Sequence, residues 1–525
     1  MKITKNITGA LLAIISFLFL NVDQVQATNI SFDKPASITG INTTEKFAYI
    51  TFDLSWEDSW RTSAGAANWD GVWVFAKYRE KGGTEWKQVV VSATSKDHSV
   101  TSNNGVDAEF SAGTTDKKAM GVFIYRGKDG SGNINWDGVK LKWNYENNAV
   151  ADINNVEVKV YAIEMVYVNK GAFKVGSGSG TENCSFYTFP DSTASYAINS
   201  ENAIITGPLK GNLYYKKHFY AEPYYGTIPA EFPKGFNPFW CMKYEITQGQ
   251  YVDFLNSLDR KQQISRVNSD VSQSTVKNTF VMSKTETILN RNGVRCNATV
   301  SATDPITFYC DLNGNGVPNE KNDGQNISLN YICWADGAAY CDWAGLRPMT
   351  ELEYEKACRG SLTPVPNEYA WGSTNIINTK QMVDTGTVAE SSFNTDANAI
   401  FDNPVSIPGP VRAGYFIKVK GTREQNGVSF FGISDLSGNL FERCVTVSNS
   451  SGVAFKGTNG DGNLNEWGNA TNSDWPGLNA TGSGFRGGSY YYGSIFARVS
   501  DRQYAGLGDW QRYNHYGFRA VRSAE

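Results

Sequence analysis

The sequence has few of the side chains that build catalytic metal centres. Histidine occurs only at positions 98, 218 and 515, never with the His-x3-His spacing that brings two imidazoles to one metal. Cysteine occurs eight times but never as Cys-x2-Cys, the spacing typical of zinc sites, and none follows Cys444. These gaps disfavour both a multi-histidine metal centre and a zinc site.

Basic runs and long apolar runs are also missing. The net charge is −4 and no basic cluster occurs, so we expect neither nucleic acid nor an anionic membrane as a partner. No apolar segment is long enough to span a bilayer comfortably, including Ile7–Leu20, which follows Lys2 and Lys5 and precedes a small-residue cleavage site at Val25–Ala27. We therefore predict a signal peptide at 1–27 and a mature chain without a membrane span. Its expected location is secreted, periplasmic or at the cell surface; a retained N-terminal anchor is the alternative.

Glycine and aromatic residues are abundant. The 51 glycines and an aromatic content of 13% indicate a turn-rich chain with more strand than helix, and 525 residues suggest two or three domains. Residues 28–161 contain strand-like segments separated by Gly, Asn and Asp. These segments are Phe47–Trp56, Val72–Tyr78, Trp86–Val91, Met120–Tyr125 and Val156–Tyr161. Their spacing predicts a β-sandwich of the immunoglobulin or fibronectin type, which spaces or docks the next domain.

The pentapeptide Asn-Trp-Asp-Gly-Val occurs twice, at Asn68–Val72 and Asn135–Val139. We expect an Asp-Gly turn that leads into a strand, with the tryptophan packed at the end of the sandwich. Carbohydrate binding by Trp69 and Trp136 is the alternative interpretation.

Three helices are expected in residues 162–525. Thr247–Gln250 forms a capping-box sequence, followed by apolar residues at helical spacing from Tyr251 to Leu258. A second helix covers Trp334–Trp343 and ends at Gly345, and a third begins with the capping box Thr350–Glu353 and ends at Gly360.

Four phrases in this second part carry a family resemblance. They are Ala339–Arg359, Asp435–Glu442, Phe485–Tyr490 and Tyr516–Arg519. Together they resemble the formylglycine-generating enzyme (sulfatase-modifying factor) family over about residues 165–523. The resemblance implies a loop-rich variant of the C-type lectin fold, opened by a hairpin at Met165–Ser177. With the β-sandwich this gives an α+β protein of two domains, 28–161 and 162–525.

The resemblance does not extend to the family's redox centres. Its copper-dependent oxidases need a cysteine pair just after the Gly-Gly-Ser phrase, but this chain has Tyr490, Tyr491, Tyr492 and Ala497 there. The related sulfoxide synthases bind iron through three histidines, which this chain cannot supply within the domain. We expect no copper or iron and no catalytic residues.

The eight cysteines then need a structural role. Cys296 and Cys310 bracket a short loop and are the preferred disulfide, since exported chains permit disulfides. In the oxidases of the family, the positions of Cys341 and Cys358 pair with C-terminal cysteines that are absent here. These two could pair with each other or with Cys241, Cys333 or Cys444, or remain buried thiols.

Structural calcium is the expected cofactor. The resemblance places Asp435, the Gly438 and Leu440 carbonyls, and Glu442 on one of the family's two calcium sites, and such oxygen ligands suit Ca²⁺. Asn398 is the nearest match to the second site. A turn held by hydrogen bonds alone is the alternative at the first site.

A separate Asn/Gly-rich loop resembles part of an EF-hand. Asp311, Asn313, Asn315 and Gly316 match positions 1, 3, 5 and 6, but position 12 is Asn322 instead of glutamate. The loop could therefore hold a metal or be a metal-free turn.

Aromatic side chains crowd the last loops of the chain. We predict that Tyr492, Arg498, Tyr504, Trp510, Tyr513 and His515 form a ligand-binding face, because tyrosine offers a large contact area at low entropic cost. The alternative is that several of these rings fill the core, and for Tyr490 and Tyr516 we favour that alternative.

Three functional hypotheses follow. The preferred one is an exported, non-catalytic protein of this family that binds a protein or glycan partner at the cell surface or in a secretion apparatus. A metal-dependent oxidase with a rebuilt site is the second, and a diversified ligand-binding protein with the C-type lectin fold is the third.

Overall fold

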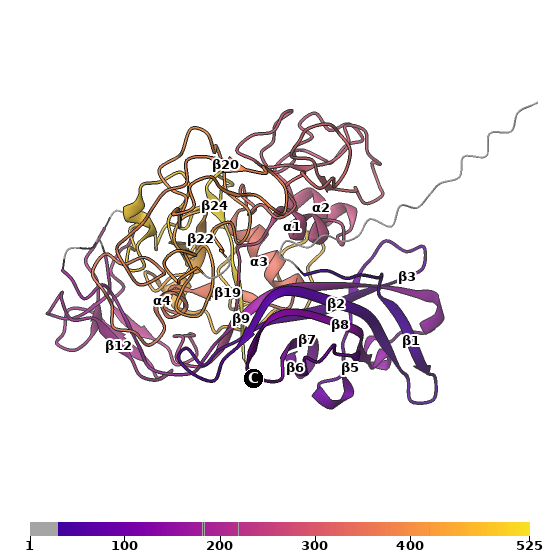
Figure 1. Ribbon diagram of the computed structural model, residues 1–525, viewed down its shortest axis with the longest axis horizontal. Coiled ribbons are helices and arrows are strands. Elements are labelled where there is room, and N and C mark those ends of the chain that lie inside the picture. The colour runs from indigo at the N-terminus through magenta and orange to yellow at the C-terminus, as the bar shows by residue number, and fades with distance from the viewer. Residues whose placement is uncertain (1–29, 181, 183, 219, 419–420, 525) are drawn as a thin grey trace, which may run out of the picture.

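The computed structural model describes residues 30–180, 182, 184–218, 220–418 and 421–524. These residues form a loop-rich α+β structure in which short strands outnumber helices (Figure 1). Within these ranges no helix has the length and apolar character needed to cross a membrane. The predicted signal peptide lies outside the described residues.

The N-terminal segment contains the longest strands. Its elements are β1 (Ser37–Asn42), β2 (Phe47–Arg61), β3 (Asp70–Glu80), β4 (Lys87–Gln88), η1 (Ser95–Asp97), β5 (Ser99–Ser102), β6 (Ala108–Thr115), β7 (Lys118–Arg126), β8 (Gly130–Trp143), η2 (Tyr145–Asn148), η3 (Ile153–Asn155) and β9 (Val156–Val168).

The remaining elements are short and separated by long loops. The strands are β10 (Phe173–Val175), β11 (Tyr187–Thr188), β12 (Tyr196–Ile198), β13 (Ile204–Thr206), β14 (Leu213–Tyr214), β15 (Gly226–Ile228), β16 (Phe239–Met242), β17 (Val294–Arg295), β18 (Tyr309–Cys310), β19 (Arg347–Thr350), β20 (Met382–Val383), β21 (Ser391–Ser392), β22 (Phe441–Val445), β23 (Ser483–Arg486), β24 (Tyr516–Gly517) and β25 (Ala520–Ser523). The helices are α1 (Gln248–Leu255), α2 (Arg260–Arg266), α3 (Trp334–Trp343), α4 (Glu351–Arg359), α5 (Ser450–Val453) and η4 (Ser494–Ala497).

Two sheets enclose the N-terminal core. One has the strand order β1-β2-β8-β5, and the larger has the order β23-β22-β19-β25-β16-β9-β3-β7-β6. Side chains of β2 and β8 and side chains of β3, β7 and β9 belong to one buried apolar cluster, in which Trp56 and Trp136 make an edge-to-face contact at 5.1 Å between centroids. That this segment is a β-sandwich of the immunoglobulin or fibronectin type stays a prediction.

Strand β9 joins this segment to the rest of the chain. Its residues 156–166 pair antiparallel with β3, and its last residues, 165–168, pair antiparallel with β16. The predicted boundary at 161/162 falls inside β9, and one sheet continues through it (Figure 1).

Aromatic packing fixes the two parts together. Phe123 of β7 stacks on Trp240 of β16 with ring centroids 4.2 Å apart. Trp73 Nε1 donates to the Ala344 carbonyl at 2.8 Å, and the buried Lys77 ammonium donates to the carbonyls of Trp343 and Gly462 at 2.7 and 2.9 Å. The N-terminal segment is therefore docked on the second part by buried contacts. Docking was one of the two roles expected for it, the other being that of a spacer.

The three predicted helices are confirmed. Thr247 caps α1 and Thr350 caps α4 in complete capping boxes, since each threonine accepts a backbone hydrogen bond and the Gln250 or Glu353 side chain returns one. α3 spans the predicted Trp334–Trp343, and α4 ends at Gly360, whose φ is +61°.

Other local predictions are wrong. The expected hairpin at Met165–Ser177 does not form, because Met165–Val168 continues β9 while β10 pairs with β12. Of the predicted strand at Trp86–Val91, only β4 is regular. Both Asp-Gly pairs lie inside strands, not in turns before them, and Trp136 is buried at 1% exposure, which leaves it no surface for a carbohydrate.

Candidate functional site

The loop before β22 places two acidic side chains in the core. Asp435 and Asn439 both have positive φ, +61° and +59°, which bends the segment 435–440 into a tight loop. Asp435 Oδ2 and Glu442 Oε2 are buried and accept no hydrogen bond from any described residue. Burial raises the pKa of Asp435 to about 6, and burial also raises the pKa of Glu442.

Two further side chains, which sequence reasoning missed at this loop, hold it in place. Glu245 accepts from Asn439 Nδ2 at 2.6 Å and from the Leu440 amide at 3.0 Å, while Arg519 donates to Glu442 Oε1. Glu245 lies three residues after the end of β16 and far from this loop in sequence, and β16 pairs with β25, which directly follows Arg519. The signal for Arg519 was its place in the Tyr516–Arg519 phrase.

These residues fit a cation. Two orphaned carboxylate oxygens in a buried loop need a partner, because an unpaired buried charge is costly. Asp435 and Glu442 would bind calcium through those oxygens, together with the predicted carbonyls of Gly438 and Leu440. No group of three His, Cys, Asp or Glu side chains in the described ranges is arranged to hold a metal, so backbone carbonyls would have to complete the shell. Calcium here stays a prediction.

Asn398, the candidate for the second calcium site, forms hydrogen bonds with residues other than Asp435 and Glu442. Its Oδ1 accepts from the Ile377 amide at 2.8 Å, and its Nδ2 donates to the Glu424 carbonyl at 3.1 Å. The side chain connects two loops in this conformation, and a metal would have to displace the Ile377 amide.

The Asp311–Gly316 loop is held by its own hydrogen bonds. Asn313 Oδ1 accepts from the Asn315 amide at 2.9 Å and Asn315 Oδ1 from the Val317 amide at 2.7 Å, while Asp311 pairs with Arg295. Asp311 Oδ1 and Asp323 Oδ1 are nevertheless buried and unpartnered. Sequence reasoning missed Asp323, which directly follows position 12 of the EF-hand-like match.

The aromatic side chains of the last loops gather around His515. Its ring stacks between Tyr491 and Tyr513, at centroid distances of 5.5 and 5.7 Å, and makes edge contacts with Tyr492 and Tyr516. The partial burial of the imidazole in this cluster lowers the pKa of His515 to about 4. Tyr504 joins the cluster through Tyr492 at 5.7 Å.

The predicted ligand-binding face is thus partly surface and partly core. Trp510, Tyr513 and Tyr491 are exposed, at 64%, 42% and 47%, whereas Tyr490 and Tyr516 are buried as expected. Tyr492, Tyr504 and His515 are half-buried. We call Tyr491, Trp510 and Tyr513 the aromatic surface.

Arg498 faces elsewhere. Burial raises the pKa of Glu182, and the nearby charge of Arg498 opposes that rise. Among the described residues, the arginines that lie over aromatic rings do not include Arg498. Its Nε is buried without a partner. The structure therefore does not bring Arg498 together with the aromatic surface.

All eight cysteines are buried free thiols, so the predicted Cys296–Cys310 disulfide is wrong for this structure. Val294, not Cys296, lies opposite Cys310 in the β17–β18 pair. Burial raises the pKa of every one of these thiols, to about 11 for Cys184 and Cys333, which keeps them protonated and unreactive at neutral pH.

The segment after Gly488 has no thiol and little space. Gly488 has φ +68°, and a Cβ there would lie 2.7 Å from the Ala497 amide nitrogen, so the chain crosses itself closely at this point. Tyr492 and Phe496 then pack on Phe441 and Tyr504. Aromatic rings occupy the region in which the resemblance predicts the oxidase's cysteine pair.

Fold and site together define a loop-rich α+β domain with buried carboxylates and an aromatic surface near its C-terminus. The family description "Sulfatase-modifying factor enzyme 1-like domain" matches residues 151–524. The chain belongs to this family. The formylglycine-generating enzyme of Mus musculus is 42% identical over 48 residues, which cover 9% of this chain and 12% of that relative's length.

Proposed function

We propose that this protein is an exported, non-catalytic member of the family that binds a protein or glycan partner through its aromatic surface. The observation that carries the proposal is the ring cluster around His515, which occupies the region after Gly488 and includes the exposed rings of Tyr491 and Tyr513; exposed Trp510 lies three residues before Tyr513. Exposed aromatic side chains on a fixed base are typical of binding surfaces, because little conformational entropy is lost on contact.

The family's copper chemistry has no support in these residues. It requires thiolates, and the eight thiols here are buried, protonated at neutral pH and distributed over the core. A C-type-lectin-like fold, calcium at Asp435 and Glu442, and a location at the cell surface or in a secretion apparatus are parts of the same proposal. Calcium would have a structural role, since both carboxylates lie beneath the surface.

A site-specific photo-crosslinker tests the proposal. Placed at position 510 in the full-length protein in its native cells, it should give a discrete cross-linked product. Position 467 is the matched control, because Trp467 is also an exposed tryptophan, at 51%, but lies outside the aromatic surface. Equal products at both positions, or none at 510, would reject the aromatic surface as the binding site.

A further inference from the structure

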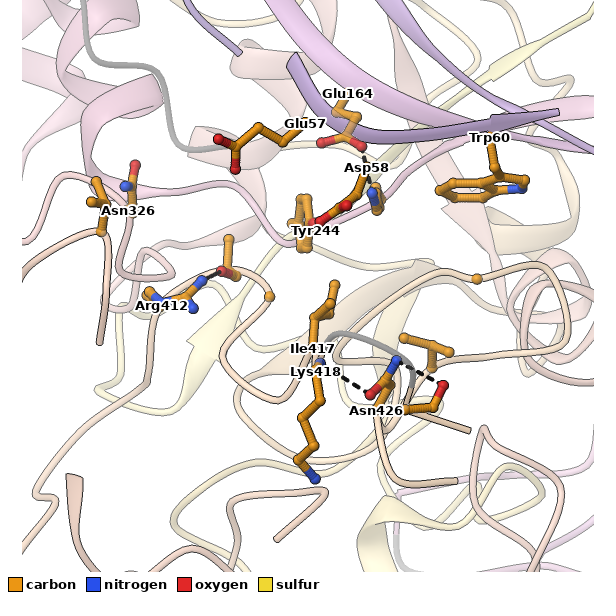
Figure 2. Close-up of a pocket in the computed structure, with 17 residues that line it drawn as sticks. Glu57, Asp58, Trp60, Glu164, Tyr244, Asn326, Arg412, Ile417, Lys418 and Asn426 are labelled. Atoms are coloured by element: carbon orange, nitrogen blue, oxygen red, sulfur yellow. Dashed lines mark hydrogen bonds and ion pairs between the residues drawn. The ribbon is translucent and has the colours of Figure 1, made fainter. Parts of the chain in front are cut away.

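A pocket of about 450 Å³ lies between the N-terminal segment and the family domain, and we propose that it binds a small neutral saccharide (Figure 2). Its lining comes from β2, from the turn after β16 and from the loops near Asn326 and residues 412–432. The aromatic surface contributes none of this lining, so the proposal does not rest on the proposed function.

A β-bulge supplies one wall. Trp56 pairs with Ile134 and Ser59 with Gly132, so Glu57 and Asp58 together face the single residue Asn133. Asp58 has φ +53°, and its amide donates to Asn133 Oδ1 at 3.2 Å. Bulges re-aim side chains, and this one presents two exposed carboxylates to the pocket (Figure 2).

Neutral and cationic groups line another side. Asn326 Oδ1 is buried and has no partner among the described residues, so it is an acceptor that needs a donor. Arg412 is held by hydrogen bonds from Nε to the Glu390 carbonyl and from Nη1 to the Ala413 carbonyl, the latter at 2.7 Å. Lys418 extends away from the other labelled residues (Figure 2), and its ammonium donates to the carbonyls of Ala397 and Gln425.

Two rings complete the pocket. Trp60 and Tyr244 surround the Lys243 ammonium, which lies 4.8 and 5.4 Å from their centroids and pairs with Glu164 at 2.6 Å. An internal cation thus already occupies the cation–π position, which leaves the remaining ring surface for apolar contact.

These groups favour a neutral, hydroxyl-rich ligand. A carboxylate or phosphate would approach Asp58, whereas an ammonium would approach Arg412, so either charge meets repulsion from one side. A hydroxyl can donate to Asp58 or Asn326 and accept from Arg412, and the C–H face of a sugar ring can pack on Trp60 or Tyr244. The volume lies within the range of about 300–1,000 Å³ typical of small-molecule sites.

Isothermal titration of the full mature protein tests this inference. The neutral probes are glucose, cellobiose, maltose and lactose, and the charged probes are glucosamine and glucuronic acid. We expect saturable binding of at least one neutral probe. Both charged probes should bind at least about tenfold more weakly than that neutral probe. Absence of binding by every neutral probe, or tighter binding of a charged one, would overturn the proposal.

Two variants localise the binding. Asp58→Asn keeps the shape and tolerates the positive φ, and should weaken the neutral probe at least about tenfold through loss of a charged hydrogen bond. Asp116→Asn is its matched control, because Asp116 is also exposed with positive φ, +50°, but lies in the turn between β6 and β7. Trp60→Ala should also abolish binding while Trp467→Ala should not. Unchanged affinity in Asp58→Asn would place the ligand elsewhere and reject the site, even if Trp60→Ala failed to fold.

Discussion

Arg519 donates two hydrogen bonds to the same carboxylate oxygen of Glu442, from Nε at 2.9 Å and from Nη2 at 2.6 Å. The other oxygen, Oε2, is buried without a partner, as is Asp435 Oδ2. The guanidinium therefore compensates only part of the negative charge of this loop. The remaining oxygens are the physical reason to expect calcium there.

Chelation should lower the melting temperature of the protein. A cation at a free concentration 100 times its Kd stabilises the folded state by about 2.7 kcal/mol, and EDTA would remove this stabilisation. Glu442→Gln should abolish the response to EDTA in differential scanning calorimetry. Glu353→Gln is the control, since it breaks the buried pair with Arg347 but leaves Asp435 and Glu442 unchanged. A response retained in Glu442→Gln would exclude this loop as the calcium site.

The carboxylate of Glu351 lies between two buried arginines. It accepts from Arg486 Nη1 at 3.0 Å and from Arg502 Nε and Nη2 at 2.6 and 2.9 Å. Glu351→Gln should lower the free energy of unfolding by about 3–5 kcal/mol, because it leaves buried positive charge unpaired. Urea denaturation measures this change.

Glu466→Gln is the control for Glu351→Gln, because its pair with Lys261 is exposed and should contribute nothing measurable. Equal midpoints for the two variants would contradict the structural role of the buried network.

Asp342 should make stability depend on pH. Burial raises its pKa to about 6 from an ordinary value of 3.8, so its contribution is fully present below about pH 3.8 and is lost as pH rises through about 6. Between pH 4 and 7 the unfolding free energy of the wild type should therefore fall, relative to Asp342→Asn, by up to about 3 kcal/mol. Denaturation of both proteins across this range gives the difference, and a constant difference would contradict the raised pKa.

His515 should stay neutral through the physiological range. Because its pKa is lowered to about 4, its ring resonances in NMR should not move between pH 8 and 5. His515→Phe identifies its signals among those of the three histidines and preserves the ring stack. A titration midpoint near 6.5 would show that the ring is solvated and the cluster open.

Local patterns in the sequence predicted the helices well. Thr247 and Thr350 each have a partner three residues later, and the spacing of a capping box is a property of consecutive residues. The long strands β2, β3 and β7 were also visible, because apolar alternation and glycine-rich turns are local signals.

Long-range relationships were not predictable in this way. Nothing in the residues around Glu245 indicates that β16 lies beside β25, so its contact with Leu440 could not be foreseen. The predicted hairpin at Met165–Ser177 was wrong because β9 pairs with β3 on one edge and with β16 on the other. These strand pairings stabilise the extended chain at Met165 more than a local turn would. The pocket at Asp58 depends on a bulge whose position is set by the register with β8.

Elemental analysis of the purified mature protein, before and after EDTA, tests most directly that this family member has no redox centre. The account predicts calcium in the protein before EDTA and neither copper nor iron, with the calcium lost on chelation. Copper or iron near one per chain would contradict the account, and oxidation of a thiol substrate under oxygen would then have to be measured.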